Sequence, residues 1–281
     1  MTPRATARRP LLVVDGDSLA HRAYHALPKS INKNAVVGFT NMLIRLWEME
    51  EPRTVFVGWD TLTVPTYRHE AFPAYQSGRH FDDSLLEQLD LLPELVRALG
   101  FGTAKEAGYE ADDFVAAAVR SEEKRRGTSC VVVTSDRDLF QLASARTVIV
   151  TPIRGVSELA RIGPDEVRER YGVEPEQVPD FIALRGDPSD RLPGARGVGP
   201  KTAASILKQH GTLEAALEAG RFPQQREELL LYQRIASLDA SAPLPPLRDQ
   251  SPKWAEASSE VRSWGLNQLA ERLAARAAGP A

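Results

Sequence analysis

The stretch LLVVDGD, residues 11–17, sets the interpretation of the whole chain. Four apolar residues followed by an acid and a glycine are typical of a short buried strand that ends in a turn. The pattern recurs: the run Thr54 to Trp59 ends at Asp60, and the run Cys130 to Val133 leads to Asp136. Three strands with acids at their carboxyl ends therefore organise the first half of the sequence.

Helical patterns separate these strands. One continues to Ala26, one covers Val36 to Met49, and one covers Asp83 to Leu99, where Pro93 predicts a kink or break. Another begins at Glu110. Strands that alternate with helices predict an α/β fold with a central, mostly parallel sheet flanked by helices. Ligands of such sheets bind outside the carboxyl ends of the strands, which is where the acids are expected.

The second half has a different character. From about Gly163 the sequence predicts short helices broken by glycine and proline, with a glycine-rich hairpin at residues 194–202 and a closing helix from Leu266 to Ala278. We therefore expect a disordered tail at 1–9, an α/β core at 10–162 and a helical part at 163–281.

Composition narrows the class of protein. The chain has 281 residues, is 42% hydrophobic and has no apolar run of the roughly 20 residues that a membrane span needs. The single cysteine, Cys130, excludes an internal disulfide and favours a cytoplasmic location. The net charge of −3 argues against a nucleic-acid partner at first, but Arg191 to His210 contains four basic residues and no acid.

Each acid alone has an ordinary explanation. Glu110, Asp112 and Asp113 open a predicted helix, where acids complement the helix dipole. Asp136 and Asp138 could belong to a turn, and Asp187 could cap a helix before Pro188. Together the acids predict a cluster, and clustered carboxylates stay ionised only beside cations. Oxygen ligands without histidine or cysteine favour Mg²⁺ or Mn²⁺, and two such ions support in-line phosphoryl displacement.

These motifs resemble the 5′→3′ exonuclease and flap endonuclease family, which includes the 5′-nuclease domain of bacterial DNA polymerase I and stand-alone bacterial and phage exonucleases. The matching stretches, in order, are VVDGDSLAHRAYHALP, TYRHEAFPAYQSGR, GYEADD, TSDRDLFQL and RGDPSDRLPGARGVGPKTA. The resemblance implies a PIN-like 5′-nuclease fold, an arch region at about 64–84 and a DNA-binding helix-three-turn-helix at about 186–210. The implied activity is metal-dependent hydrolysis of DNA phosphodiesters at 5′ ends or 5′ flaps, leaving 5′-phosphates.

The resemblance also assigns roles to individual residues. Nine acids would be direct or water-mediated ligands of the divalent ions: Asp15, Asp60, Glu110, Asp112, Asp113, Asp136, Asp138, Asp187 and Asp190. Seven residues would contact DNA: Arg68 and Arg79 at the arch, and Arg196, Gly197, Gly199, Lys201 and Thr202 on the duplex backbone. A potassium ion would be held by the backbone carbonyls of Leu184, Arg185, Pro193, Ala195 and Val198. We expect a monomer that binds no membrane.

One position departs from the family pattern. The family usually has Tyr-Lys where this chain has Tyr75-Gln76, and the lysine is held to assist the transition state. Without this lysine we predict reduced activity. Arg79 could take the place of the lysine, and we therefore also predict Arg79 to be a catalytic residue.

Two alternatives stay open. The first is a DNA-binding protein whose cleavage is weakened or lost, for which Gln76 is the support. The second is a phosphatase of the haloacid-dehalogenase type, which begins with a similar Asp-x-Asp motif at Asp15 and Asp17. That second interpretation leaves GYEADD and residues 187–202 without a purpose.

Overall fold

The computed structural model describes residues 9–78, 80–125, 127–154 and 158–278, so the tail expected at 1–9 lies outside the described residues up to position 8. Within these ranges the strands form one six-stranded sheet in the order β3-β2-β1-β4-β5-β6. The strands are β1 (Leu11–Asp15), β2 (Thr54–Gly58), β3 (Gly102–Ala104), β4 (Cys130–Val133), β5 (Thr147–Arg154) and β6 (Glu158–Ile162). Neighbours from β3 to β5 pair in parallel, and β6 alone runs antiparallel to β5. The predicted α/β fold with a mostly parallel sheet is confirmed.

The centre of the sheet is buried on both faces. All five residues of β1 are buried, and their side chains alternate between the two hydrophobic clusters of the core. Leu11 and Val13 belong to one cluster, whereas Leu12 and Val14 belong to the other. This two-sided burial explains why the strand is a continuous apolar run rather than an alternating pattern.

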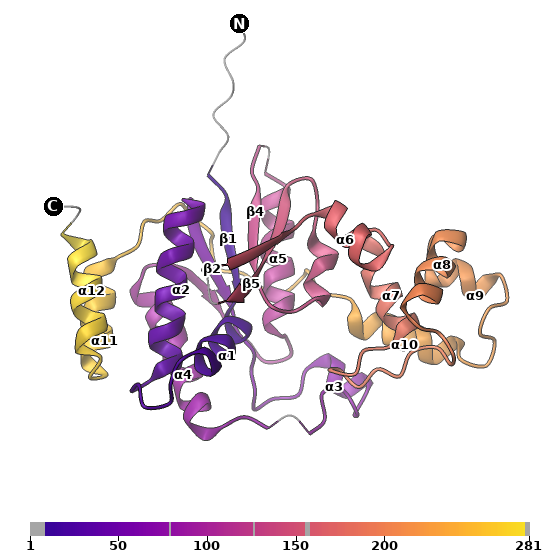
Figure 1. Ribbon diagram of the computed structural model, residues 1–281, viewed down its shortest axis with the longest axis horizontal. Helices are drawn as coiled ribbons and strands as arrows, with labels where there is room; N and C mark the ends of the chain where they lie inside the picture. Colours follow the sequence, from indigo (N-terminus) through magenta and orange to yellow (C-terminus); the bar gives the residue numbers. More distant parts are fainter. Residues whose placement is uncertain (1–8, 79, 126, 155–157, 279–281) are drawn as a thin grey trace, which may run out of the picture.

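Helices cover each face of the sheet. One face is covered by α1 (Gly16–Ala26), α2 (Asn34–Glu50) and α4 (Asp83–Ala98). The helices α11 (Trp254–Ser263) and α12 (Asn267–Ala277) extend the same hydrophobic cluster, with α11 packed on α4. The other face is covered by α5 (Ala111–Glu123) and the short helix η1 (Asp138–Leu142). Figure 1 shows α11 and α12 at one end of the molecule and α8 and α9 at the other. None of the described helices combines the length and the apolar character of a membrane span.

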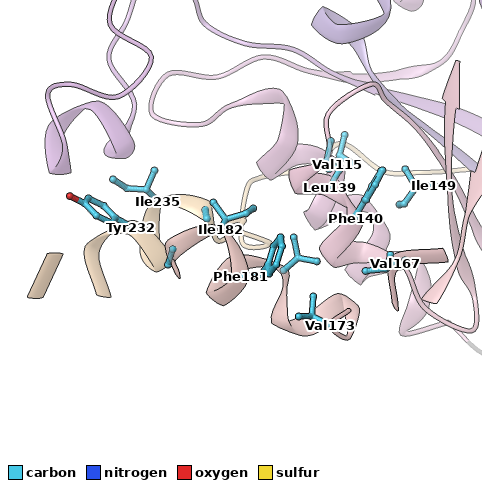
Figure 2. Close-up of a cluster of buried hydrophobic side chains, with 14 of the residues drawn as sticks. Val115, Leu139, Phe140, Ile149, Val167, Val173, Phe181, Ile182, Tyr232 and Ile235 are labelled. Carbon is cyan, nitrogen blue, oxygen red and sulfur yellow. The ribbon is translucent and has the colours of Figure 1, made fainter. Parts of the chain in front are cut away.

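The helical part continues the core of the second face. It consists of α6 (Pro164–Tyr171), η2 (Pro175–Gln177), α7 (Val178–Arg185), α8 (Pro200–His210), α9 (Leu213–Glu218) and α10 (Arg226–Ala236). Val115 of α5, Phe140 of η1, Phe181 of α7 and Ile235 of α10 belong to one continuous hydrophobic cluster (Figure 2). The helical part is therefore positioned by apolar packing against the sheet layer.

Several details differ from the sequence-based expectation. Helix α4 continues through Pro93 without ending there, because Leu92, Leu95 and other apolar residues around it are buried and hold the helix on the sheet. Strand β3 has only three residues, and β6 carries exposed residues, so neither shows a clear periodic signal. In the segment between β2 and α4, the short helix α3 (Tyr67–Ala71) lies within the predicted arch region.

Candidate active site

An acidic pocket lies where the carboxyl ends of three neighbouring strands meet. The cavity has a volume of about 480 Å³ and is bounded by β1, β2, β4 and the start of α5. Five of the nine predicted acids line it: Asp15, Asp60, Glu110, Asp112 and Asp136. Parallel strands in the order β2-β1-β4 bring these residues together although up to 121 positions separate them.

Backbone and hydroxyl donors orient the acids that follow β1 and β2. Asp15 caps α1: its Oδ1 accepts from the Ser18 amide at 3.0 Å, and its Oδ2 accepts from Thr134 Oγ1 at 2.7 Å. Asp60 Oδ1 accepts from the Ala111 amide at 2.7 Å, at the first turn of α5. Helix N-termini offer unpaired N–H groups, so each carboxylate is held by the helix that it faces.

Glu110 is held by side chains of the arch region. Its Oε1 accepts from Thr66 Oγ1 at 2.8 Å, and its Oε2 accepts from the Tyr75 hydroxyl at 3.0 Å. Both donors are buried, with exposed fractions of 3% for Thr66 and 4% for Tyr75. Two residues of the segment predicted to form the arch are therefore connected to an acid of the pocket.

Burial and mutual repulsion act on the carboxylates. The pKa of Asp15 is raised to about 7, mainly by burial and also by the charges of Asp60 and Asp136, although the hydrogen bonds from Thr134 and Ser18 act in the opposite direction. Burial also raises the pKa of Asp112, with repulsion from Asp136, Asp15 and Asp60 as additional causes. The acids thus lie within electrostatic reach of one another, and only protons or cations can neutralise the pocket.

The donor set fits a hydrated hard cation. The acids offer only oxygen ligands, which suit Mg²⁺ or Mn²⁺. Among the described residues no three Asp, Glu, His or Cys side chains converge closely enough to ligate one ion together. Mg²⁺ usually keeps several waters and uses one or two carboxylates, so the arrangement fits an ion held largely through water.

Three further acids predicted as ligands form a second group beside Asp136, namely Asp138, Asp187 and Asp190. Burial raises the pKa of Asp138, followed by repulsion from Asp136, Asp190 and Asp187. Asp187 is fixed by Arg185 at 3.1 Å and by the Ser189 amide at 2.8 Å. These acids extend the negative field of the pocket toward the helical part.

Asp113 and Arg68 do not fit the roles that the resemblance assigned to them. Asp113 has no exposed surface and accepts two bonds of 2.8 Å from the Arg68 guanidinium. Arg68 is 2% exposed, and its guanidinium also donates to the carbonyls of Ile235 and Ser237 and lies 3.3 Å from Glu110 Oε2. Neither residue lines the acidic pocket, and both are buried. The metal role of Asp113 and the DNA contact of Arg68 stay predictions, and this geometry does not favour them.

The geometry of a capping box explains why the Asp113 side chain points away from the pocket that Glu110 lines. The spacing of three predicts that Glu110 and Asp113 share a helical face, but Glu110 is the N-cap with φ −108° and ψ 164°. Asp113 Oδ2 turns back and accepts from the Glu110 amide at 3.1 Å. One acid consequently points to the pocket and the other to the interior.

Gln76 lies in the lining of the pocket. Its Nε2 donates to the Tyr75 hydroxyl at 2.7 Å and to Asp190 Oδ1 at 3.1 Å. An uncharged donor therefore stands between the two groups of acids. Arg79 lies outside the described residues, and its roles stay predictions.

Asp17 is a pocket residue that the sequence motifs did not place among the ligands. It is 7% exposed, lines the cavity and accepts from the Asp60 amide at 2.8 Å through Oδ2. Burial raises its pKa well above the usual value, with Asp60 as the next cause. The sequence did carry a signal for Asp17, because it lies only two residues after the predicted ligand Asp15. Tyr75 carried no such signal, because its contact with Glu110 spans 35 positions.

The glycine-rich hairpin connects α7 to α8. Gly194 has φ +75°, and a Cβ there would lie 2.7 Å from the Arg185 carbonyl carbon, so the two backbones meet at this residue. Gly197 and Gly199 have open space around them, and Lys201 and Thr202 are exposed in the first turn of α8. Accessible amides at a helix start, together with Arg196, suit a phosphate backbone.

The predicted potassium carbonyls surround this hairpin. The Leu184 carbonyl accepts from the Ala195 amide at 2.8 Å, and the Ala195 carbonyl accepts from the Val198 amide at 3.1 Å. Each carbonyl keeps a second lone pair for an ion. With Arg185 and Pro193, these groups remain a prediction.

This fold and pocket define a class: α/β proteins with clustered carboxylates at the carboxyl edge of a parallel sheet, suited to hard cations and phosphate chemistry. Residues 10–172 match the family described as 5′-3′ exonuclease, N-terminal resolvase-like domain, and residues 173–258 match 5′-3′ exonuclease, C-terminal SAM fold. The chain belongs to the 5′-3′ exonuclease family of nucleases, which confirms the resemblance inferred from the motifs.

Curated relatives agree with this assignment. DNA polymerase I of Bacillus caldotenax is 39% identical over 254 residues, which cover 84% of this chain and 29% of that protein. DNA polymerase I of Bacillus subtilis is 34% identical over 95% of this chain and 32% of its own length. The chain thus spans about a third of the length of these two relatives.

Two solved structures share the fold. The T5 D15 protein co-crystallised with metal ions superposes with a TM-score of 0.71 at 19% identity, covering 94% of this chain and 98% of that one. The catalytic core of Rad2 in complex with DNA substrate gives a TM-score of 0.62 at 14% identity, covering 95% and 91%.

Proposed function

We propose that this chain is a metal-dependent 5′→3′ exonuclease and structure-specific 5′-flap endonuclease that hydrolyses DNA and leaves 5′-phosphates. The observation that carries the proposal is the acidic pocket, which draws carboxylates from β1, β2, β4 and α5 to one edge of the sheet. Family membership gives the reaction class, and the T5 and Rad2 structures were solved with metal ions and with DNA substrate, respectively.

The pocket residues would bind cations and orient the scissile phosphate. Two Mg²⁺ or Mn²⁺ ions, when bound, supply an activated water and neutralise charge on the phosphate. Asp15, Asp60, Asp112 and Asp136 would hold them directly or through water, with Asp138, Asp187 and Asp190 adding charge from the second group. Glu110 keeps its orientation through Thr66 and Tyr75.

The helical part would bind the duplex backbone. The accessible amides of Gly197 and Gly199 and the side chains of Arg196, Lys201 and Thr202 carry this proposal. A potassium ion on the carbonyls of the hairpin would add positive charge there. We further propose that the chain acts as a monomer, with a nuclease core at 10–162, an arch at about 64–84 and a helical part at 163–281. Within that helical part α6 to α10 would bind DNA, because α11 and α12 lie at the opposite end of the molecule (Figure 1).

A second candidate is a structure-specific DNA-binding protein with weakened cleavage. Gln76 favours it, because a neutral amide occupies the place where the family usually has a lysine. The clustered carboxylates speak against it, since they are costly to hold together and serve no purpose in a protein that only binds phosphate.

A labelled 5′-flap duplex separates the two candidates. The wild-type protein is incubated with Mg²⁺, with Mn²⁺ and with a chelator, beside the Asp136→Ala variant. The nuclease predicts a 5′-phosphate product that requires the metal and that the variant does not form. Tight binding without any metal-dependent product would support the DNA-binding protein instead.

A further inference from the structure

A second cavity opens beside the acidic pocket. It has a volume of about 320 Å³ and is formed mainly by the loop that follows Asp60. We call it the apolar cavity after four of its residues, Leu62, Val64, Pro65 and Phe81. Polar side chains complete the lining, among them His69 and the threonines at 61, 63 and 66. Its size lies at the lower end of the roughly 300–1,000 Å³ that small-molecule sites occupy.

The apolar cavity presents hydrophobic side chains to solvent. Leu62 is 37% exposed and Val64 is 43% exposed, and they are two of only five large hydrophobic residues that the described part of the chain exposes. Phe81 adds a half-buried ring, which lies 5.0 Å from the His21 ring between centroids. Exposed apolar groups that gather around a concavity mark a binding site more often than scattered ones do.

The apolar cavity is continuous with the acidic pocket. Asp60, Glu110 and Gln76 line both cavities, as do Leu62 and Phe81. A group attached to a phosphate in the acidic pocket therefore reaches the apolar cavity directly. In a nucleic acid the groups that flank a phosphate are a sugar and a flat, largely apolar base.

A polar group of the cavity lacks a partner. The Thr61 hydroxyl oxygen is buried and has no hydrogen-bond partner among the described residues. Buried polar groups are normally satisfied, so an unpaired one in a cavity lining points to a missing ligand or water. A nucleobase carries both donors and acceptors at its edge.

We propose that the apolar cavity is a subsite for one nucleobase next to the scissile phosphate. Leu62, Val64 and Phe81 contact the face of the base, and Thr61 contacts its edge. The subsite rests on the nuclease function proposed above and adds a substrate requirement to it: the enzyme recognises an intact base beside the cut, independent of its sequence, because every base has an apolar face.

The test compares substrates with and without that base. In a 5′-flap duplex, each of the two nucleotides that flank the scissile bond is replaced in turn by an abasic analogue, and kcat/KM is measured with Mg²⁺. One of the two replacements should lower kcat/KM for the wild-type protein about fivefold or more, since stacking of a base on an aromatic side chain, here Phe81, is worth that much in other proteins. In Val64→Ser and Leu62→Ser the same replacement should change kcat/KM less than about twofold.

Met49→Ser is the matched control. Met49 is 43% exposed, like Val64, but lies on α2, so this variant should keep the full wild-type discrimination against the abasic substrate. Cleavage without discrimination in the wild-type protein, or full discrimination in both cavity variants, would overturn the subsite while leaving the nuclease function intact. No cleavage of any substrate would reject the nuclease function and the subsite with it.

Discussion

At the scale of single residues, Gln76 stands where the family usually has a lysine after the tyrosine. Its amide already donates to Asp190 and Tyr75, so the side chain reaches the correct place but carries no charge. Its backbone has φ +48°, a left-handed conformation that few residues adopt without support. The two hydrogen bonds therefore hold a strained residue in the pocket.

We predict that Gln76→Lys raises the turnover of flap cleavage about tenfold. A single preorganised donor at a developing charge is worth ~10²–10³ in other active sites, and a cation would strengthen the donor that Gln76 already provides. An ammonium at this position would keep the contact with Asp190 and add positive charge. Single-turnover cleavage of a labelled flap measures the effect. Gln76→Met, which has similar length and no donor, should be slower than the wild-type protein, and an unchanged or slower Gln76→Lys would contradict the prediction.

The Arg68–Asp113 pair shows how a single contact can imitate a functional motif. A third acid in GYEADD resembles another ligand, yet Asp113 binds an arginine in the interior. Breaking a buried ion pair by removing one partner costs ~3–5 kcal/mol. We predict that Asp113→Asn lowers the free energy of unfolding by about this amount, as urea denaturation would measure.

Asp249→Asn provides the comparison. Asp249 also pairs with a buried arginine, Arg53, at 2.8 Å, but its own side chain is 75% exposed. Exposed partners contribute less than ~1 kcal/mol, so this variant should unfold close to the wild-type protein. Equal losses in the two variants would show that burial of the Arg68–Asp113 pair is not the cause.

At the scale of elements, the hairpin between α7 and α8 depends on close backbone contact. Gly194→Ala would press a Cβ against the backbone of Arg185 and Gly186 and would also strain a φ of +75°. We predict that it weakens duplex binding while cleavage of a short single strand, if measured at saturating substrate, changes little. The dissociation constant for a duplex, measured by fluorescence anisotropy, checks this.

Gly220→Ala separates strain from contact. Gly220 has φ +82°, close to that of Gly194, but a Cβ added there would meet nothing within 4 Å. Both variants carry the same backbone penalty of ~1 kcal/mol. Only Gly194→Ala should lose affinity for the duplex, and an equal loss in Gly220→Ala would show that contact between the backbones is not required.

Features within one element could be predicted from the sequence, whereas contacts between distant elements could not. The strand Cys130–Val133 and the acids after β1, β2 and β4 follow from local patterns, because burial on both faces and turn chemistry leave signals in neighbouring residues. The arch contacts do not: Thr66 and Tyr75 reach Glu110 across 44 and 35 positions, and nothing local marks them. Local spacing also does not show that Asp113 turns away from the pocket, because a capping box and a pair of ligands have the same spacing.

At the scale of the whole molecule, β1, β2, β4, α5 and the arch all contribute to one negatively charged pocket, and that arrangement opposes folding. Burial, followed by repulsion from the neighbouring acids, raises the pKa values of Asp15 and Asp112, so ionising these two carboxyls costs folding free energy. A cation that binds only the folded protein offsets this cost. Stability should therefore depend on divalent metal.

We predict that Mg²⁺ raises the thermal midpoint of the wild-type protein and that a chelator reverses the rise. An ion at 100 times its dissociation constant adds ~2.7 kcal/mol to the free energy of unfolding. Asp112→Asn removes one charge from the pocket, so in chelator it should melt at or above the wild-type temperature. With Mg²⁺ it should gain much less than the wild-type protein, because an acid that would hold the ion is gone. Differential scanning fluorimetry with and without Mg²⁺ gives the four midpoints. An equal rise of the thermal midpoint with Mg²⁺ in the two proteins would show that the stabilising ion does not bind at Asp112. It would then contradict the proposal that the acidic pocket holds the metal for the reaction.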